Sequence, residues 1–454
     1  MYVHHAQNIV EGRPYAETGY IYNPAVPVYG PRMYPPVFPL LLTPLYKLFG
    51  PSLVPMKLEQ VAFFVLILGA VYGLWTRDLP PVHAIALVAI LGFSPTFWDA
   101  KDSALSDLPF LLFFYVSALL VRKAPHDQRG WWRWAVVTGL VLYLAMGTRS
   151  AGIALIAGLV LYSLLRYRTL TKLTVVALAV CGALVLLQTR LVGSGVGSYI
   201  GQSIHPSPHA VRTNLMAYTR AVGAFWVASA HNPLSYSLLA VVALLMIAGL
   251  FYQYKRGFTI VEAFLAPYLC VILLWPFPAG IRIMFPFIPW MVFLALTGLS
   301  CLTEHVFPRY STAATCGLLM LIAVPYVSAY HKTDFGPIRQ SDGLPEFNQL
   351  CEAVRDHTRP RDVFICFRPR ALSLYTSRAA STYDYHGTEQ EFWQYASSIR
   401  AAYVITNTFN DDDGFLVRCV GKYTSRLELA YQNPNFTMYR IRTVAEARIP
   451  ASDR

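Results

Sequence analysis

A series of long apolar runs constrains this chain more than any other feature. The runs lie near residues 55–76, 82–98, 105–121, 134–148, 151–165, 173–189, 234–253, 258–278, 283–303 and 310–330. A spanning helix needs roughly 20 apolar residues, so the pattern predicts about ten helices across a membrane. Only 14% of the residues are charged, against about 25% in soluble domains. We therefore expect an α-helical polytopic membrane protein.

One apolar segment is unsuited to spanning. Residues 34–50, YPPVFPLLLTPLYKLFG, contain Pro35, Pro36, Pro39 and Pro44 and run through Lys47. Each proline inside a helix removes a backbone hydrogen bond that lipid cannot replace. The segment predicts a juxtamembrane helix that lies in the interface or dips part-way into the bilayer.

The distribution of basic residues predicts the orientation. One set of alternate loops carries most of the loop cations and is expected to be cytoplasmic: Arg77, Arg122, Lys123, Arg129, Arg133, Arg166, Arg168, Lys172, Lys255, Arg256 and Arg309. Residues 1–54, 99–104, 190–233 and 331–454 then face outside. The formal net charge of +12 comes with no lysine-rich run or compact basic patch, so no nucleic-acid partner is expected.

The end of the chain changes character. Residues 331–454 carry charges throughout and contain short β-rich runs at 362–367, 402–406 and 436–442, with helical patterns near 344–357 and 388–400. This alternation predicts a small α/β domain outside the membrane. The expected division is an outer loop with a juxtamembrane helix (1–54), a transmembrane helical domain (55–330) and an extracytoplasmic α/β domain (331–454).

The cysteines do not indicate a metal site. The seven cysteines include no CxxC pair, so they form no metal or redox framework. We predict no metal-ligating residue in the site, and we leave open a requirement for a divalent metal as cofactor.

Ionisable residues from distant parts of the chain map to the outer mouth of the helices. They are Asp99, Lys101, Asp102, Asp107, Arg149 and Arg282. Asp107 stands at the entry to the third apolar run, where a buried carboxylate needs a cation, a metal or a hydrogen-bonding substrate. The alternative is that Asp107 only caps its helix. Arg149 and Arg282 are either interfacial snorkelling residues or ligands for an anion such as a lipid phosphate.

The longest outer loop, 190–233, is a candidate lid. Its stretch GSGVGSYIGQSIHPSPH supplies little apolar area, and its glycines permit rearrangement. A flexible connection without a function is the competing interpretation.

Five segments in order resemble the polytopic GT-C glycosyltransferases. They are AQNIVEGRPY (6–15), YPPVFPLLLTPLYKLFG (34–50), SALSDLPFLLFFYVSALLV (103–121), TRSAGIALIAGLVLYSLL (148–165) and RIMFPFIPWMVFLALTGL (282–299). The likeness covers most of residues 1–330. It is greatest to the bacterial relatives of protein mannosyltransferases and aminoarabinose transferases.

This resemblance implies a membrane enzyme that transfers a sugar from a polyprenyl-phosphate donor to a protein, lipid or glycan acceptor outside the plasma (inner) membrane. By this likeness, family members use an acidic residue in the first outer loop as base and a second acidic residue near the second outer loop. Asp107 or Asp102 matches the second position, and both are candidate catalytic residues. Arg282, Arg149 and Lys47 would bind the donor's lipid phosphate, and a single displacement would invert the anomeric centre. Two other classes stay open: a transporter or flippase of lipid-linked sugars, and a non-catalytic membrane receptor or scaffold.

The resemblance also bears on the start of the chain. Related transferases begin with a span, followed by an acidic residue shortly before the positions represented here by Tyr2, Ala6, Ile9 and Gly12. We expect in-frame codons upstream of Met1 to encode about 20 apolar residues followed by Asp or Glu. The upstream DNA tests this expectation.

Overall fold

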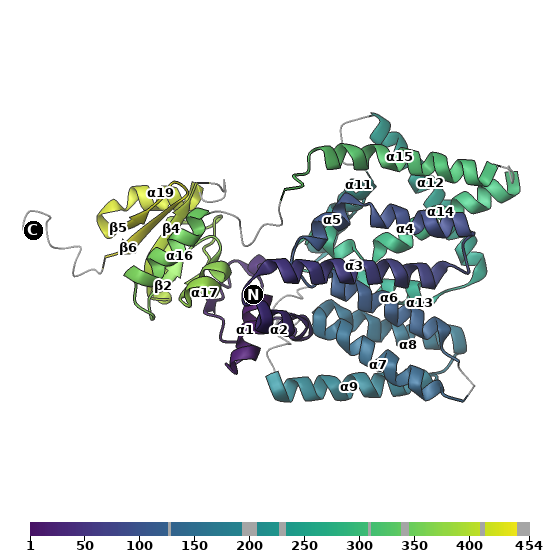
Figure 1. Ribbon diagram of the computed structural model, residues 1–454, viewed down its shortest axis with the longest axis horizontal. Helices are drawn as coiled ribbons and strands as arrows, with labels where there is room; N and C mark the ends of the chain where they lie inside the picture. The colour runs from purple at the N-terminus through teal and green to yellow at the C-terminus, as the bar shows by residue number, and fades with distance from the viewer. Residues whose placement is uncertain are drawn as a thin grey trace, which may run out of the picture. The chain divides into compact units, whose positions relative to one another are not determined.

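The computed structural model of the chain describes residues 1–125, 129–192, 207–226, 233–306, 310–336, 345–408 and 414–442 (Figure 1). The chain forms two compact units. Unit 1 contains Met1–Tyr34, Pro39–Leu53 and Ile338–Arg454, and unit 2 contains Pro35–Phe38 and Val54–Pro337.

Unit 2 is helical, and each of the predicted apolar runs contains a helix. The helices are α3 (Leu53–Trp75), α4 (Pro81–Gly92), α5 (Pro95–Lys101), α6 (Asp107–Lys123), α7 (Trp131–Thr148), α8 (Ile153–Tyr167), α9 (Lys172–Val192), α11 (Pro208–Trp226), α12 (Pro233–Arg256), α13 (Ile260–Leu273), α14 (Phe287–Val306) and α15 (Ser311–His331). Short 3-10 helices η2 (Ser150–Gly152) and η4 (Ile281–Met284) join neighbouring helices.

Fewer helices have spanning length than the sequence predicted. Among the described residues, 5 helices are long and apolar enough to cross a membrane: α3, α8 with η2, α9, α12 and α15. The pair α4 and α5, bent by 54°, makes up to 6 if it is one span. The difference from about ten arises because other apolar runs form shorter helices. For example, α6 has 17 residues and α13, which contains Pro267, has 14.

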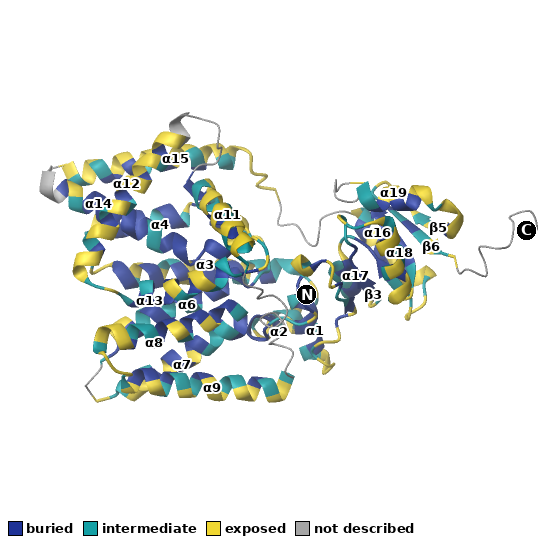
Figure 2. Cartoon of the chain, turned by 180° about the vertical axis from the view of Figure 1, so that it is seen from behind, coloured by how far each residue is buried: buried dark blue, intermediate teal, exposed yellow. Residues whose placement is uncertain are grey.

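The surface and packing of unit 2 suit a lipid environment. Many residues of its outer helices are exposed, as the yellow segments of Figure 2 show. Large apolar side chains are among them, such as Leu186 of α9 at 66% and Met320 of α15 at 74%. Inside, α12 and α14 approach closely through small residues. A Cβ added to Gly249 would stand 1.9 Å from the Leu294 carbonyl oxygen, so only glycine fits there. Close backbone approach at small residues is typical of helix pairs in membranes.

Unit 1 contains a 6-stranded sheet in the order β1-β3-β2-β4-β6-β5. The strands are β1 (Tyr20–Ile21), β2 (Val363–Ile365), β3 (Ala379–Ser381), β4 (Ala401–Asn407), β5 (Leu427–Gln432) and β6 (Phe436–Ile441). The first four in sheet order pair in parallel, and β6 pairs antiparallel with β4 and with β5.

Helices cover both faces of this sheet because successive strand residues point to opposite sides. Phe364 packs with α16 (Pro345–His357) and α17 (Pro369–Thr376), whereas Ile365 packs with α18 (Glu389–Ser398) and α19 (Gly414–Lys422). The predicted small α/β region at the end of the chain is therefore confirmed.

The N-terminal segment contributes to the same unit through α1 (Tyr2–Glu11), β1, η1 (Pro27–Tyr29) and part of α2 (Val37–Phe49). Tyr20 and Ile21 pair with Ala380 and Ser381, which the sequence did not predict. Helix α2 has 13 residues, which at about 1.5 Å per residue is shorter than the hydrocarbon core.

Candidate functional site

Asp107 is the centre of a cluster of charges in unit 2. It is the first residue of α6, after the N-cap Ser106, and its side chain is 3% exposed. Its Oδ1 accepts a hydrogen bond from Nη1 of Arg149. Its Oδ2 accepts from Nε of Arg282 at 3.0 Å and from Nη2 of the same guanidinium. The structure thus brings together three of the residues predicted to meet, and Asp107 does more than cap a helix.

Arg149 is presented by the junction between α7 and α8. Its backbone is extended, with φ −143° and ψ 135°, and its N–H donates to the Ala145 carbonyl, which ends α7. The next residues form η2, which passes so close to α7 that a Cβ on Gly152 would stand 2.7 Å from the Met146 backbone. The guanidinium carbon of Arg149 lies 5.9 Å from the ring centroid of Phe110, one turn after Asp107 on α6. Arg149 is therefore held by the carboxylate and an aromatic face.

Arg282 lies in η4, in the connection between α13 and α14. Asn214 of α11 fixes the start of this connection, because its Nδ2 donates to the carbonyls of Leu273 at 3.0 Å and Trp275 at 2.6 Å. The hydroxyl of Tyr268 donates to the carbonyl of Ile283 at 2.9 Å, beside Arg282. The backbone that carries Arg282 is thus held by side chains from two helices.

The sequence did not identify Asn214 or Tyr268. Asn214 belongs to α11, inside the segment that was expected to be a loop, and that expectation is wrong for Pro208–Trp226. The lid prediction falls mainly on residues 193–206, which lie outside the described part of the chain. A signal was available in the sequence, since Val211, Leu215, Tyr218, Val222 and Phe225 recur at the spacing of one helix face.

The cluster has a net positive charge and an open side. Two guanidinium groups face one carboxylate, and the exposed fractions of the side chains rise from 22% for Arg149 to 49% for Arg282. Nη1 of Arg282 makes no hydrogen bond to any residue in the described ranges. The arrangement can accept an anion at Arg282 while the carboxylate keeps both arginines in place.

Asp102, the other predicted acid, lies apart from these contacts. It follows the last residue of α5, its side chain is 58% exposed, and it accepts a hydrogen bond from Lys101 at 3.0 Å. The ammonium of Lys101 also lies 4.7 Å from the ring centroid of Trp98. Asp102 is consequently open to a solute, whereas the oxygens of Asp107 are occupied.

Lys47 is the remaining residue predicted to bind the donor phosphate. Lys47 is exposed in the last turn of α2 and belongs to unit 1, and its role as a phosphate neighbour stays a prediction.

Within the described residues, no group of three or more His, Cys, Asp or Glu side chains could hold a metal ion. These residues do not fit a metal site made by protein ligands alone, and we derive no step through a metal.

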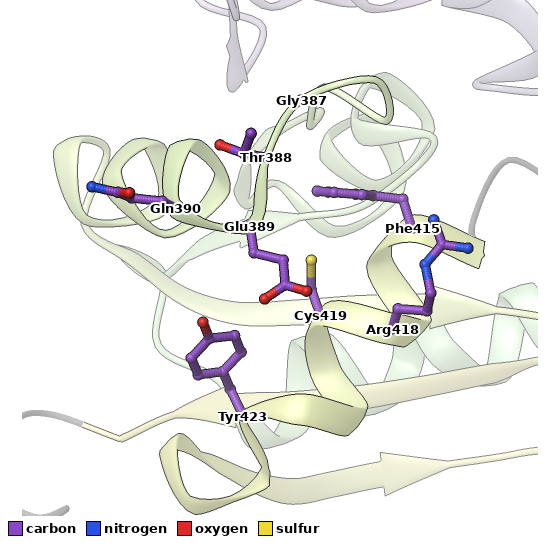
Figure 3. A pocket seen from close by; sticks show the side chains of 8 residues that line it. All are labelled: Gly387, Thr388, Glu389, Gln390, Phe415, Arg418, Cys419 and Tyr423. Atoms are coloured by element: carbon purple, nitrogen blue, oxygen red, sulfur yellow. The ribbon is translucent and has the colours of Figure 1, made fainter.

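Unit 1 has a separate pocket of 520 Å³ between α18 and α19 (Figure 3). Its lining combines aromatic and charged side chains: Gly387, Thr388, Glu389, Gln390, Phe415, Arg418, Cys419 and Tyr423. Glu389 of this lining also forms an ion pair of 2.9 Å with Lys422. None of the predicted site residues lines this pocket.

Comparisons with known proteins agree with the predicted resemblance. Residues 33–192 match the family of dolichyl-phosphate-mannose-protein mannosyltransferases. Among solved structures, ArnT from Cupriavidus metallidurans bound to undecaprenyl phosphate is similar, with a TM-score of 0.59 and 13% identity over 99% of this chain and 94% of that chain. No curated protein matches the sequence.

A second similar structure is that of the Archaeoglobus fulgidus oligosaccharyltransferase in complex with Zn and sulfate. Its TM-score is 0.55 with 13% identity, over 89% of this chain and 63% of that chain. At such identities the likeness shows the fold, and the family match of the first spans supports glycosyl transfer as the activity. The chain is a polytopic membrane protein with the fold of the GT-C glycosyltransferases.

Proposed function

We propose that the chain transfers a sugar from a polyprenyl-phosphate donor to a hydroxyl of a protein, lipid or glycan acceptor. The observation that carries this proposal is the cluster of Asp107, Arg149 and Arg282, which has a net positive charge and an exposed guanidinium. A lipid phosphate is the anion that such a site would meet at the end of a membrane helix. Similarity to ArnT bound to undecaprenyl phosphate supports the same donor class.

The arginines would stabilise the leaving group. As the bond between the anomeric carbon and the phosphate oxygen breaks, negative charge grows on the phosphate. Arg282 would donate to it with the guanidinium edge that is open to solvent, and Arg149 would add positive charge behind it. Because the planar guanidinium can contact two phosphate oxygens, lysine is a poor substitute.

Two carboxylates are candidates for the base that takes the proton of the acceptor hydroxyl. Asp107 accepts three hydrogen bonds from guanidinium groups, which leaves little of its lone-pair capacity for a proton. Asp102 is exposed, and its carboxylate accepts a hydrogen bond from Lys101. We favour Asp102 as base and Asp107 as the residue that positions the arginines. Attack by the acceptor in one displacement would invert the anomeric centre.

The proposed location follows from the orientation argument. The ends of the helices that carry Asp107, Arg149 and Arg282 were expected to face outside. We place the protein in the plasma (inner) membrane with the reaction and the C-terminal α/β domain on the outer side.

The test uses the full chain reconstituted in vesicles with a labelled undecaprenyl-phosphate sugar. Release of undecaprenyl phosphate that depends on an acceptor supports the transferase. Movement of the sugar across the bilayer without bond cleavage would instead support a transporter or flippase. If the protein is folded and shows neither activity, a receptor or scaffold is favoured.

Variants of Arg282 localise the donor site. Arg282→Lys and Arg282→Ala should both weaken binding of undecaprenyl phosphate, by about tenfold or more, because lysine retains the charge but loses the bidentate contact. Arg122→Lys is the matched control, since Arg122 pairs with Asp78 near the other end of α6. Wild-type donor kinetics in both Arg282 variants would exclude the proposed role.

A further inference from the structure

We propose that Arg370, in the C-terminal α/β domain, is a positioning residue for the arginine cluster of the donor site. It would act by holding Tyr34, the last residue of the N-terminal segment before the chain enters unit 2. The consequence for donor binding rests on the proposed function, whereas the structural consequence can be measured without it.

Arg370 binds the N-terminal segment through both ends of its guanidinium. It is the second residue of α17, and its Nη1 donates to the Tyr34 hydroxyl at 2.6 Å. Its Nη2 donates to the carbonyls of Gly30, at 3.0 Å, and Tyr29. The guanidinium carbon lies 4.6 Å from the ring centroid of Tyr20 and 5.1 Å from that of Tyr34. One side chain therefore organises β1, η1 and the residues that follow them.

Tyr34 is fixed by several partners in addition to Arg370. Its carbonyl accepts from the hydroxyl of Tyr15 at 2.8 Å, and its N–H donates to Nε2 of His5 at 3.4 Å. Its ring stacks on Tyr2 with centroids 4.7 Å apart. This concentration of contacts on one residue exceeds what a plain connection needs, and it defines where the chain leaves unit 1.

The residues that follow Tyr34 in the chain pack against α7, the helix that ends just before Arg149. Three residues after Tyr34, Val37 is 3% exposed and packs against Gly147 of α7. A Cβ on Gly147 would stand 2.4 Å from Cγ2 of Val37, so there is no space between the two residues. Gly147 precedes Arg149 by two positions. Since three residues of chain reach at most about 11 Å, a displacement of Tyr34 pulls on the packing beside Arg149.

The experiment compares Arg370→Lys with Arg378→Lys in the full chain in nanodiscs. Arg378 is the matched control because its guanidinium donates to Thr358 and Arg355, and within the described part of the chain its side chain makes no hydrogen bond to residues 27–34. Hydrogen exchange of the amides in residues 27–34 measures how strongly Arg370 stabilises this segment. Binding of undecaprenyl phosphate reports on the donor site. Tyr34→Phe, which removes the hydroxyl acceptor and keeps the ring, serves as a milder second variant.

We expect Arg370→Lys to speed exchange in 27–34 by about tenfold, the size of a lost charged hydrogen bond. We expect it to weaken undecaprenyl phosphate binding by about fivefold, with Arg378→Lys changing neither. Combining Arg370→Lys with Tyr34→Phe should give less than the product of the two effects, because both break one contact.

Three outcomes decide the matter. If Arg370→Lys leaves amide exchange in residues 27–34 unchanged, Arg370 does not stabilise this segment. Faster exchange with unchanged lipid-phosphate binding would overturn the link to the donor site and leave Arg370 with a structural role. If the wild-type protein binds no undecaprenyl phosphate, the proposed function fails, and the link fails with it, while the exchange result still decides the hold.

Discussion

Replacing Asp107 by Asn removes the negative charge between Arg149 and Arg282 while keeping the size of the side chain. The amide can still accept a hydrogen bond, but two guanidinium groups now face each other without a counter-charge. If Asp107 positions the arginines, the variant should lose stability and donor binding together. If Asp107 is only a base, stability should be nearly unchanged.

The magnitude follows from the geometry. A distance of 3.0 Å between Nε of Arg282 and Oδ2 of Asp107 corresponds to a Coulomb energy of about 5–6 kcal/mol at an effective dielectric constant near 20. The Arg282 side chain is 49% exposed, so solvent screens much of this attraction. Removing one partner of a buried ion pair costs about 3–5 kcal/mol. We expect Asp107→Asn to lower the free energy of unfolding by about 3 kcal/mol, at the lower end of this range. Most of this loss should come from Arg149, which is the more buried of the two arginines.

A double-mutant cycle in mixed micelles measures this effect by unfolding titration. Arg282→Gln removes the second cation, so the variant Asp107→Asn with Arg282→Gln should be more stable than the sum of the two single changes by about 1 kcal/mol or more. Asp78→Asn is the control, because Asp78 pairs with one arginine, Arg122, and its side chain is 25% exposed against 3% for Asp107. Asp78→Asn should lower the free energy of unfolding by about 1 kcal/mol or less.

Additive effects at Asp107 and Arg282 would refute the reasoning. So would an Asp107→Asn protein of wild-type stability that binds undecaprenyl phosphate normally but transfers no sugar. That result would make Asp107 the base.

Three further predictions concern other parts of the molecule. Asp102→Asn should lower kcat by about 10²-fold or more, as expected for loss of a general base, without weakening undecaprenyl phosphate binding, and unchanged kcat would reject this residue. Gly249→Ala should destabilise the α12–α14 pair by about 2 kcal/mol or more because the added Cβ meets the Leu294 carbonyl. Gly182→Ala, inside α9 with nothing within 4 Å of the added Cβ, should not destabilise the protein in the same unfolding titration. Burial lowers the pKa of His5 to about 3, so the unfolded chain binds a proton that the folded chain does not, and unit 1 should lose about 1.4 kcal/mol per pH unit as the pH falls below about 6.5. His5→Asn should reduce the slope by this amount without abolishing it, because burial also lowers the pKa of His4 to about 4. An equal slope in both proteins would contradict the prediction.

Much of the architecture could be predicted from the sequence because it is encoded locally. Each apolar run of unit 2 forms a helix, since a stretch of apolar residues stabilises a helix in lipid whatever its neighbours are. The strands β4 and β6 and the helices α16 and α18 also lie where period and composition placed them. The resemblance of five ordered segments pointed to the GT-C fold, which the comparisons confirm.

The site could be predicted only as a set of residues. The sequence indicated that Asp107, Arg149 and Arg282 would reach one end of the bundle. It could not decide between a helix cap, snorkelling cations and a buried ion pair, because each is compatible with the same local pattern. The pairing depends on how α6, the end of α7 and η4 pack.

Only the tertiary structure joined the two ends of the chain. The sequence by itself determined the apolar helices and the α/β tail, because periodicity and composition act over a few residues. Strand β1 has 2 residues, too few for any period to show, and it exists through its pairing with β3. The bonds from Arg370 to Tyr34 and Gly30 likewise span more than 330 residues. No local signal encodes such contacts, since they form only when the folded sheet and α17 bring distant backbone groups within hydrogen-bonding distance.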